Sequence, residues 1–316
     1  MRQMYKIIFI GLDFAGKTSI LRILEGGYSK IDKIKPTVGT ERAEWNILGF
    51  KVINWDLGGQ KQFREDYLAN YKQMLDETNL IVFVIDMQDD SRFNEAGAYF
   101  DDILHALDHL KIKCPIVLCL HKVDPDIIYN ASMITNLNWV TNLFSDYSHD
   151  HDFEIKVFIT SIFDRKSLIE MFSYSIGRLM PLSILSQILE DFIQQTKSLG
   201  ILGAILLDPN LFVVGTAFFD SNDKTFAYKT INAFLTLIGD FQNLFDENQK
   251  AYFDISLGND KIYKFRLNKI TEMNLPYYLL VMGTSSFDID EIYSLFRTKF
   301  VSVIEKRIIK LVESVE

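Results

Sequence analysis

The sequence is poor in cysteine and has no long apolar run, and each shortage excludes a class of protein. Only two cysteines, Cys114 and Cys119, occur among 316 residues. They lie beside or within the apolar segment Ile116–Leu120, so we expect two small buried side chains in a reducing compartment and no disulfide framework. No apolar run reaches the roughly 18 residues of a membrane-spanning helix. The longest candidate, Leu199–Phe219, is interrupted by the turn sequence Asp208-Pro209-Asn210.

Basic residues are also fewer than acidic ones. The 33 Lys and Arg residues against 42 Asp and Glu give a net charge of −9, and neither half of the chain is basic. We therefore expect no nucleic-acid partner, and attraction to anionic lipid is disfavoured as well. A strand pattern already begins at Tyr5, and we see no signal peptide or lipidation motif. These features predict a cytoplasmic protein without a direct membrane anchor, whose recruitment to membranes would run through a protein partner.

Strand-like and helix-like patterns alternate through the first 180 residues. The expected strands are Tyr5–Ile10, two runs within Glu44–Trp55, Leu80–Asp86, Ile116–Leu120 and Ile155–Ile159. The expected helices are Gly16–Leu24, Asn94–Leu110, Ile134–Phe144 and Lys166–Leu179. This alternation predicts an α/β domain with a mostly parallel sheet and helices on both faces.

The pattern changes near Pro181. The expected order is then helix, two strands, helix, three strands, helix: Ser183–Lys197, Ile201–Leu207, Leu211–Phe219, Tyr228–Phe245, Ala251–Leu257, Ile262–Leu267, Tyr277–Met282 and Asp290–Val312. Adjacent strands joined by tight turns predict an antiparallel sheet. We therefore expect two domains, an α/β domain over residues 1–180 and an α+β domain over residues 183–316.

The segment Gly11–Thr18 fits the phosphate-loop pattern G-x-x-x-x-G-K-[ST] between a strand and a helix, which is the context that the motif requires. Its glycines let backbone N–H groups wrap phosphates at a helix N-terminus. Lys17 would add a point charge, and the Thr18 hydroxyl would bind Mg²⁺. The expected nucleotide-binding residues of this segment are Gly11, Asp13, Ala15, Gly16, Lys17, Thr18 and Ser19.

A second motif, Trp55-Asp56-Leu57-Gly58-Gly59-Gln60, follows an expected strand and resembles the second switch of Arf-family GTPases. The resemblance implies that Asp56 supports the Mg²⁺ ion, that the Gly59 N–H binds the γ-phosphate and that Gln60 orients the attacking water. Pro36-Thr37 resembles the Arf-type first switch, so Thr37 would complete the metal site, with Thr40 as a nearby competitor.

The motif His121-Lys122-Val123-Asp124 follows another expected strand, where the usual GTPase pattern is N-K-x-D. Asp124 would accept the guanine N–H groups, which adenine lacks, and the Lys122 stem would cover the base. The imidazole of His121 cannot reproduce the paired donor and acceptor of an amide. Both H-K-x-D and Thr160-Ser161-Ile162 resemble Rag/Gtr GTPases, which implies that Ser161 and Ile162 line the base site.

Three other features remain open at this stage. His105 and His109 have metal-binding spacing on an expected helix, but no third ligand is evident, which favours a solvated helix face. Phe14 either packs over a switch or a partner, or fills local space. Lys61 and Arg64 could supply an internal arginine-finger-like charge, although a solvated switch surface is favoured.

The element order after Pro181 resembles the roadblock or longin-like domain that follows the GTPase domain in Rag proteins. This resemblance implies a homodimer or heterodimer through the second domain, with other roadblock-type proteins and with exchange and activating proteins as partners. The expected function is a switch that binds GTP or GDP with Mg²⁺ and hydrolyses GTP slowly. The alternatives are a nucleotide-locked scaffold that does not hydrolyse GTP and, against the character of Asp124, an ATP-dependent phosphotransferase.

Overall fold

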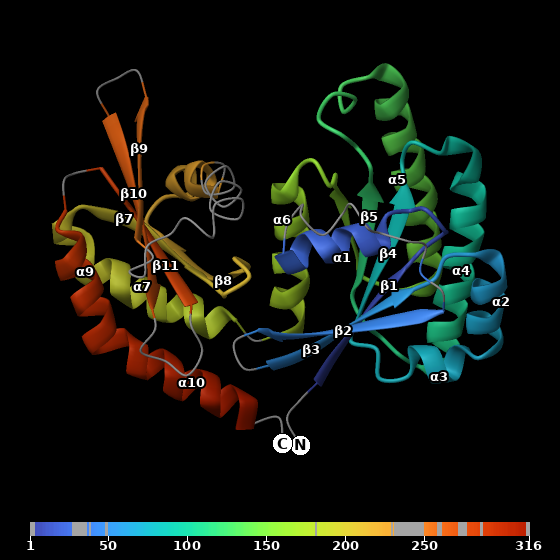
Figure 1. Ribbon diagram of the computed structural model, residues 1–316, viewed down its shortest axis with the longest axis horizontal. Helices are drawn as coiled ribbons and strands as arrows, with labels where there is room; N and C mark the ends of the chain where they lie inside the picture. The colour runs from blue at the N-terminus through green and yellow to red at the C-terminus, as the bar shows by residue number, and fades with distance from the viewer. Residues whose placement is uncertain are drawn as a thin grey trace. The chain divides into compact units, whose positions relative to one another are not determined.

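The computed structural model describes residues 4–26, 37, 39–47, 50–180, 182–228, 230, 250–257, 261–270, 277–284 and 287–313. The chain divides into two compact units (Figure 1). The first unit contains Met4–Asn46 and Lys51–Leu179, and Met180–Glu316 is the main segment of the second.

The first unit is built on a six-stranded sheet with the order β2-β3-β1-β4-β5-β6. The strands are β1 (Met4–Ile10), β2 (Thr40–Ile47), β3 (Phe50–Leu57), β4 (Leu80–Asp86), β5 (Ile116–His121) and β6 (Ile155–Ile159). β1 pairs in parallel with both β3 and β4, and β5 pairs in parallel with both β4 and β6. The predicted mostly parallel α/β fold is therefore confirmed.

Helices cover both faces of this sheet. They are α1 (Lys17–Gly26), α2 (Lys61–Ala69), α3 (Tyr71–Leu75), α4 (Phe93–Leu110), α5 (Ala131–His151) and α6 (Arg165–Leu179). α1 and α6 contact each other on one face, and α3, α4 and α5 lie on the other (Figure 1).

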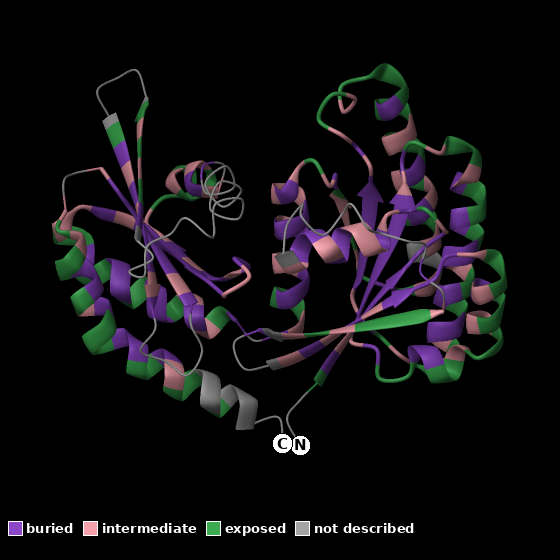
Figure 2. Cartoon of the chain, in the orientation of Figure 1, coloured by how far each residue is buried: buried purple, intermediate pink, exposed green. Residues whose placement is uncertain are grey.

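The core of the first unit explains why β4 and β5 are interior strands of the sheet. Every residue from Leu80 to Ile85 and from Ile116 to His121 is buried, as continuous apolar runs predict for strands covered on both faces (Figure 2). The ring of Phe100 on α4 packs 4.9 Å from Phe83 and 4.9 Å from Phe144, measured between ring centroids. Both cysteines are buried free thiols, as expected from the sequence.

Helix lengths are where the sequence pattern was least informative in this unit. α5 extends well beyond the expected Ile134–Phe144, through polar residues such as Ser145, whose hydroxyl donates to the carbonyl of Thr141 at 2.8 Å. α2 was not predicted, because its one buried residue is Arg64 and the helix therefore lacks an apolar stripe.

The second unit contains a five-stranded sheet with the order β8-β7-β11-β10-β9. Its strands are β7 (Ile201–Leu207), β8 (Val213–Phe218), β9 (Lys250–Leu257), β10 (Lys261–Ile270) and β11 (Tyr277–Gly283). All four neighbouring pairs are antiparallel. The predicted α+β fold with an antiparallel sheet is confirmed.

α7 (Ser183–Thr196) packs on β7 and β8 and contacts the C-terminal helices. The expected helix Asp290–Val312 is divided into α9 (Ile289–Phe296), a π-helical turn at Arg297–Val301 and α10 (Ser302–Glu313). The Phe192 ring of α7 lies 5.0 Å from Phe296 and 5.5 Å from Phe300, so both aromatics face α7. Residues 221–228 are helical, whereas most of the expected helix Tyr228–Phe245 lies outside the described residues.

Asp208 forms the tight turn that the sequence predicted between β7 and β8. Its carboxylate accepts the backbone N–H groups of Asn210 at 2.9 Å and Phe212 at 2.8 Å. Among the described residues no single helix has both the length and the apolar character to cross a membrane, although the consecutive pair α6 and Ser183–Leu199 meets that test jointly, by composition and combined length alone.

Candidate functional site

The loop between β1 and α1 has the backbone conformation that its glycines permit. Gly11 has a φ of 148° and Gly16 a φ of 96°, values that favour glycine. A Cβ at Gly11 would stand 2.2 Å from the carbonyl oxygen of Val84, and one at Gly16 would stand 2.5 Å from Cδ2 of His121. Both positions therefore need glycine for conformation and for space.

Lys17 is folded into this loop. Its ammonium group donates to the carbonyl oxygens of Gly11 at 3.0 Å and Leu12 at 2.8 Å, and the residue is 5% exposed. Burial lowers the Lys17 pKa to about 8. A buried cation surrounded by backbone groups is well placed to receive a polyanion such as a nucleotide phosphate.

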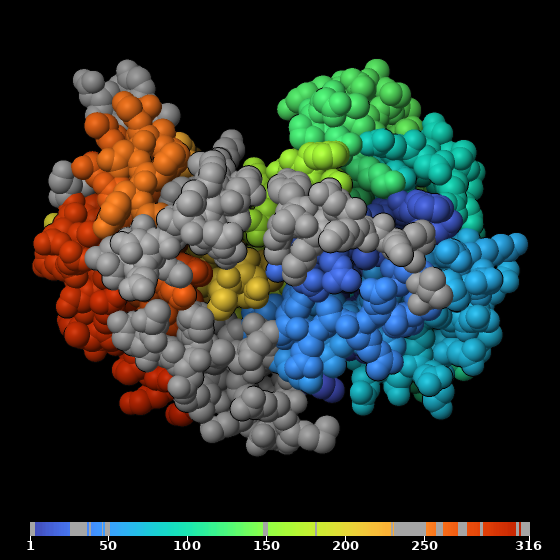
Figure 3. All heavy atoms as spheres, viewed as in Figure 1, coloured from blue at the N-terminus to red at the C-terminus, as the bar shows by residue number. Residues whose placement is uncertain are grey.

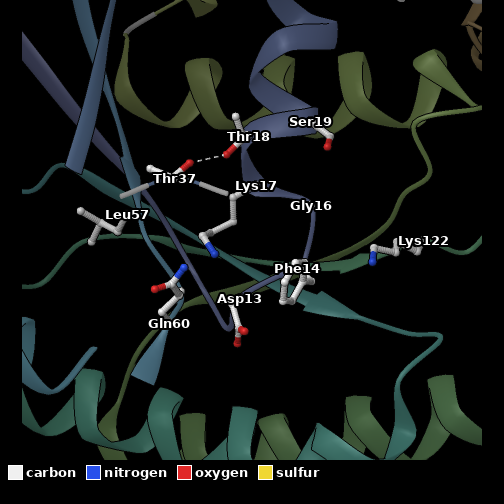
Figure 4. Close-up of a pocket in the computed structure, with 11 residues that line it drawn as sticks. Asp13, Phe14, Gly16, Lys17, Thr18, Ser19, Thr37, Leu57, Gln60 and Lys122 are labelled. Atoms are coloured by element: carbon white, nitrogen blue, oxygen red, sulfur yellow. Dashed lines mark hydrogen bonds between the residues drawn. The ribbon is translucent and has the colours of Figure 1, made fainter. Parts of the chain in front are cut away.

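Three side-chain oxygens from separate parts of the chain meet beside Lys17. The Thr18 hydroxyl lies 2.8 Å from the Thr37 hydroxyl (Figure 4). It also lies 2.5 Å from Oδ2 of Asp56, and Thr37 lies 3.1 Å from the same carboxylate oxygen. Of the two threonines that the sequence left open, Thr37 is therefore the one that reaches Asp56.

This oxygen cluster fits a Mg²⁺ ion. Asp56 is 3% exposed, and burial raises its pKa. Its second oxygen, Oδ1, is buried and finds no hydrogen-bond partner among the described residues. A buried carboxylate with one oxygen unsatisfied, next to two hydroxyls, is the set of hard oxygen donors that Mg²⁺ prefers.

Backbone contacts hold the segment after β3 against the phosphate loop. The Asp13 N–H donates to the Gly59 carbonyl at 3.0 Å, and a Cβ at Gly59 would stand 2.2 Å from the Asp13 nitrogen. The Gly58 N–H donates to the Gly39 carbonyl at 2.8 Å, and the Tyr67 hydroxyl donates to the same oxygen at 2.7 Å. These bonds tie the chain next to Thr37 to the segment that carries Gln60.

A cavity of about 260 Å³ opens over these groups. Figure 4 shows Lys17 and Gln60 reaching into it from opposite sides, with Phe14 and Lys122 at its other end. Its lining brings together nine of the sequence-predicted site residues: Asp13, Gly16, Lys17, Thr18, Ser19, Thr37, Gly59, Gln60 and Lys122. Asp56 joins them through its bonds to the two threonines.

His121 is buried behind the loop and does not line the cavity. It is 1% exposed, and its Nδ1 lies 2.8 Å from the Thr160 hydroxyl, which also lies 3.0 Å from Cys119 Sγ. Burial, with a smaller effect from the charge of Lys122, lowers the His121 pKa to about 3, so the imidazole is neutral. Its ring edge against Gly16 shows that this residue supports the phosphate loop as well as the base-reading motif.

The carboxylate of Asp124 is held by two side chains. Ser161 donates its hydroxyl to Oδ1 at 2.5 Å, and Gln88 donates its amide to Oδ2 at 2.9 Å and to the Lys122 carbonyl at 2.9 Å. Lys122 pairs with Asp86 at 2.6 Å. Ile162 is half-buried in the turn after Ser161. One cluster therefore forms at the carboxyl ends of β5 and β6, from Lys122, Asp124, Ser161 and Ile162. The remaining predicted residues of the phosphate loop, Gly11 and Ala15, are buried.

Two residues with a place at the site were missed by sequence reasoning. Gln88 orients Asp124, and Arg92 pairs with Asp13 at 2.6 Å and with Glu95 at 2.9 Å. Both belong to the segment Asp86–Arg92, which starts at the last residue of β4. The sequence of this segment resembles that of Arf proteins, and this resemblance was the available signal. Neither residue type nor spacing there indicates a contact with the loop or with Asp124.

The expectation of a solvated Arg64 was wrong. Arg64 is 8% exposed and forms an ion pair with Glu95, with its guanidinium 5.2 Å from the ring of Tyr99. Lys61 remains exposed and lies 3.8 Å from Glu65. Phe14 does not fill local space, because its side chain is 70% exposed at the rim of the cavity.

Comparison with known proteins identifies the first unit. The sequence profile of the ADP-ribosylation factor (Arf) family matches residues 1–176. ADP-ribosylation factor-like protein 3 of Chlamydomonas reinhardtii is 37% identical over 99 residues, which are 31% of this chain and 52% of that protein. The protein of the same name from Caenorhabditis elegans is 34% identical over 121 residues, 38% of this chain and 61% of that protein.

The chain therefore spans between half and two thirds of the length of these curated relatives. Among solved structures, the Arl6 BBS3 small GTPase from Trypanosoma brucei with bound nucleotide analogue GppNp matches with a TM-score of 0.44 and 20% identity. That match covers 56% of this chain and 99% of the other.

Proposed function

The chain belongs to the Arf family of small GTPases, and from this premise we propose that it is a GTP-binding switch that hydrolyses GTP slowly with Mg²⁺. The observation that carries the proposal is the meeting of Thr18, Thr37 and Asp56 beside Lys17, under a cavity into which Gln60 points. Arf-family GTPases bind guanine nucleotide with Mg²⁺, and this oxygen cluster is suited to that ion.

Each group has a proposed task. The loop N–H groups and Lys17 would hold the phosphates, and Thr18, Thr37 and Asp56 would hold the Mg²⁺ ion, which neutralises phosphate charge when bound. Gln60 would orient the attacking water. Thr37 and the Gly59 N–H would contact the γ-phosphate and lose this contact after hydrolysis. Their two segments would move together, because hydrogen bonds through Gly39 and Tyr67 join them.

The base-reading cluster supports guanine. Asp124 presents a carboxylate fixed by Ser161 and Gln88, and a fixed carboxylate discriminates between guanine and adenine because adenine offers no matching N–H groups. The neutral, buried His121 would act by holding the loop after β5 and the phosphate loop together.

Single-turnover hydrolysis of GTP by the purified chain tests this function. In the described part of the chain Arg64 is tied to Glu95 and Arg92 to Asp13, so neither is free to act as an arginine finger. We expect turnover on the order of 10⁻⁴ to 10⁻³ s⁻¹, as for unassisted relatives. Gln60→Leu should lower this rate about tenfold or more with GTP affinity retained. Gln62→Leu, at an exposed glutamine two residues further on in the first turn of α2, is the matched control.

Two other functions are outcomes of the same assay. GTP that stays intact through prolonged incubation with Mg²⁺ would identify a nucleotide-locked scaffold and overturn the hydrolytic proposal. Equal rates for wild type and Gln60→Leu would remove Gln60 from the mechanism. Preference for ATP in competition binding would overturn the guanine assignment and favour a phosphotransferase.

For the second unit we propose a roadblock or longin-like domain of the Rag type, through which the protein forms a homodimer or heterodimer. The support is its antiparallel sheet with flanking helices, together with the Rag-like His121-Lys122-Val123-Asp124 and Thr160-Ser161-Ile162 sequences. Mass measurement of the purified full chain by light scattering between about 1 and 50 µM, alone and mixed with roadblock-type proteins, tests it. A monomer under all of these conditions would contradict the proposal.

The proposed partners also include exchange and activating proteins, and the proposed location is the cytoplasm with membrane recruitment through a protein partner. The net charge of −9 supports this, because an acidic protein gains little from an anionic lipid surface. Co-sedimentation with anionic vesicles tests the location. Strong binding without a partner would contradict it.

A further inference from the structure

A cluster of histidine and aspartate side chains lies where α4 and the end of α5 pack together, on residues without a role in nucleotide binding. Asp101, His105 and Asp108 belong to α4, and His151 is the last residue of α5. The two helices contact each other, and teal and green atoms from this part of the chain meet at the upper right of Figure 3. The structure thus supplies His105 with neighbours that the i, i+4 pairing with His109 did not indicate. His109 instead lies 2.9 Å from the Tyr71 hydroxyl.

The ligand atoms of Asp101, His105 and His151 are spaced for a metal ion. One atom from each lies within 4.8 Å of the other two. Nε2 of His151 is 3.2 Å from Oδ1 of Asp101, and Nε2 of His105 is 3.7 Å from Oδ2. Tetrahedral zinc with bonds of about 2.0–2.1 Å places its ligand atoms roughly 3.3–3.5 Å apart. The two separations lie on either side of that spacing but involve different oxygens of Asp101, so side-chain rotation would have to bring one of these oxygens within reach of both imidazoles.

A second carboxylate sets the orientation of His151. Nδ1 of His151 lies 2.6 Å from Oδ2 of Asp108, and Lys113 donates to Asp108 at 3.0 Å and to the His151 carbonyl at 3.0 Å. The contact between Nδ1 and Asp108 leaves Nε2 directed at Asp101, where it can serve as a metal ligand. The same carboxylate–histidine–metal relation recurs in protein metal sites.

The mixture of donors selects the kind of metal. Two imidazoles and one carboxylate suit zinc and its neighbours, whereas Mg²⁺ prefers oxygen ligands throughout. The His151 side chain is 9% exposed, Asp101 33% and His105 67%, so an ion that enters from solvent would meet His105 first and the buried His151 last.

We propose that Asp101, His105 and His151 form a binding site for a divalent transition metal of the zinc class, which ties the end of α5 to α4. A water molecule would complete the tetrahedron. The buried thiols Cys114 and Cys119 do not compete for the ion at the surface.

Metal titration of the full chain, loaded with GDP and excess Mg²⁺, tests the site. Co²⁺ should give the visible absorption of a tetrahedral complex at one ion per chain, and Zn²⁺ should displace it. At a free Zn²⁺ concentration of about 100 times Kd we expect a rise in Tm of roughly 5–10 °C. His105→Ala should weaken Zn²⁺ binding at least about tenfold, and Asp108→Asn about 10- to 100-fold. His109→Ala is the control, because it removes an exposed histidine from the same helix outside the cluster.

Zn²⁺ binding by the wild type and the two histidine variants decides whether the site exists. Loss of Zn²⁺ binding in His105→Ala with retention in His109→Ala supports the site. Equal Zn²⁺ binding by wild type and His105→Ala, or no binding by wild type, overturns it. His105 is an exposed surface residue, so His105→Ala should fold normally, and its Tm without metal checks this.

Discussion

Replacement of His121 by asparagine should remove a pH-dependent part of the stability of the first unit. His121 is neutral and buried in the folded protein with a pKa of about 3, whereas an unfolded histidine titrates near 6.5. Below pH 6.5 the unfolded chain therefore binds a proton that folded His121 does not. The stabilisation from His121 is complete above pH 6.5 and is lost progressively as the pH falls from 6.5 toward 3.

The magnitude follows from these two pKa values. At pH 5 the unfolded histidine is protonated and the folded one is not, so lowering the pH from 7.5 to 5 should cost the wild type about 2 kcal/mol through this residue. The figure depends mainly on the unfolded pKa, because at pH 5 folded His121 is neutral for any pKa below about 4. The asparagine of the His121→Asn variant carries no titrating group, although its smaller side chain should lower stability by a pH-independent amount.

Urea unfolding of wild type and His121→Asn at pH 7.5 and pH 5 measures the effect, with GDP affinity determined at each pH so that ligand stabilisation can be subtracted. The drop between the two pH values should be about 2 kcal/mol smaller in His121→Asn. His109→Asn, at an exposed histidine bonded to Tyr71, should keep the wild-type drop. An equal drop in wild type and His121→Asn would refute the reasoning that His121 is buried and neutral.

Three further variants probe the loop and its metal site. Thr18→Ala removes one of three clustered oxygens, so GDP should leave at least about tenfold faster at millimolar Mg²⁺, as measured with a fluorescent analogue. Gly16→Ala places a Cβ 2.5 Å from His121 at a φ of 96°, so the free energy of unfolding in urea should fall by about 2–3 kcal/mol. Phe14→Ala removes a side chain that is 70% exposed, so the same measurement should change by less than about 0.5 kcal/mol. A large loss in Phe14→Ala would mean that this ring is packed.

The sequence was informative where one local pattern determines one structure. The apolar runs Leu80–Asp86 and Ile116–Leu120 became interior strands because continuous apolar residues need cover on both faces. The loop Gly11–Thr18 could be placed for the same reason, since its glycines and Lys17 act within a few residues of each other. Local reasoning failed for α2, which presents no apolar stripe and buries a charged residue, Arg64, against Glu95 on another helix.

Side-chain pairs between distant segments were beyond such reasoning. Gln88 has no feature that distinguishes it from a surface glutamine, and only the parallel pairing of β4 with β5 brings it to Asp124. The same holds for His151, whose partners Asp101 and Asp108 become apparent only once α5 is seen to run on to residue 151.

Three contacts hold the phosphate loop, and through them a movement of the loop would displace other segments of the first unit. The Asp13 N–H donates to Gly59, the Asp13 carboxylate pairs with Arg92, and Gly16 lies against His121. Two of these contacts leave no room even for a methyl group, so the loop cannot shift without moving the segment of Gln60 or the end of β5. A change in the loop on nucleotide binding would therefore reach the switch segment and the base-reading segment together. The glycines at positions 16 and 59 make that coupling stiff, because packed contacts of this kind do not deform continuously.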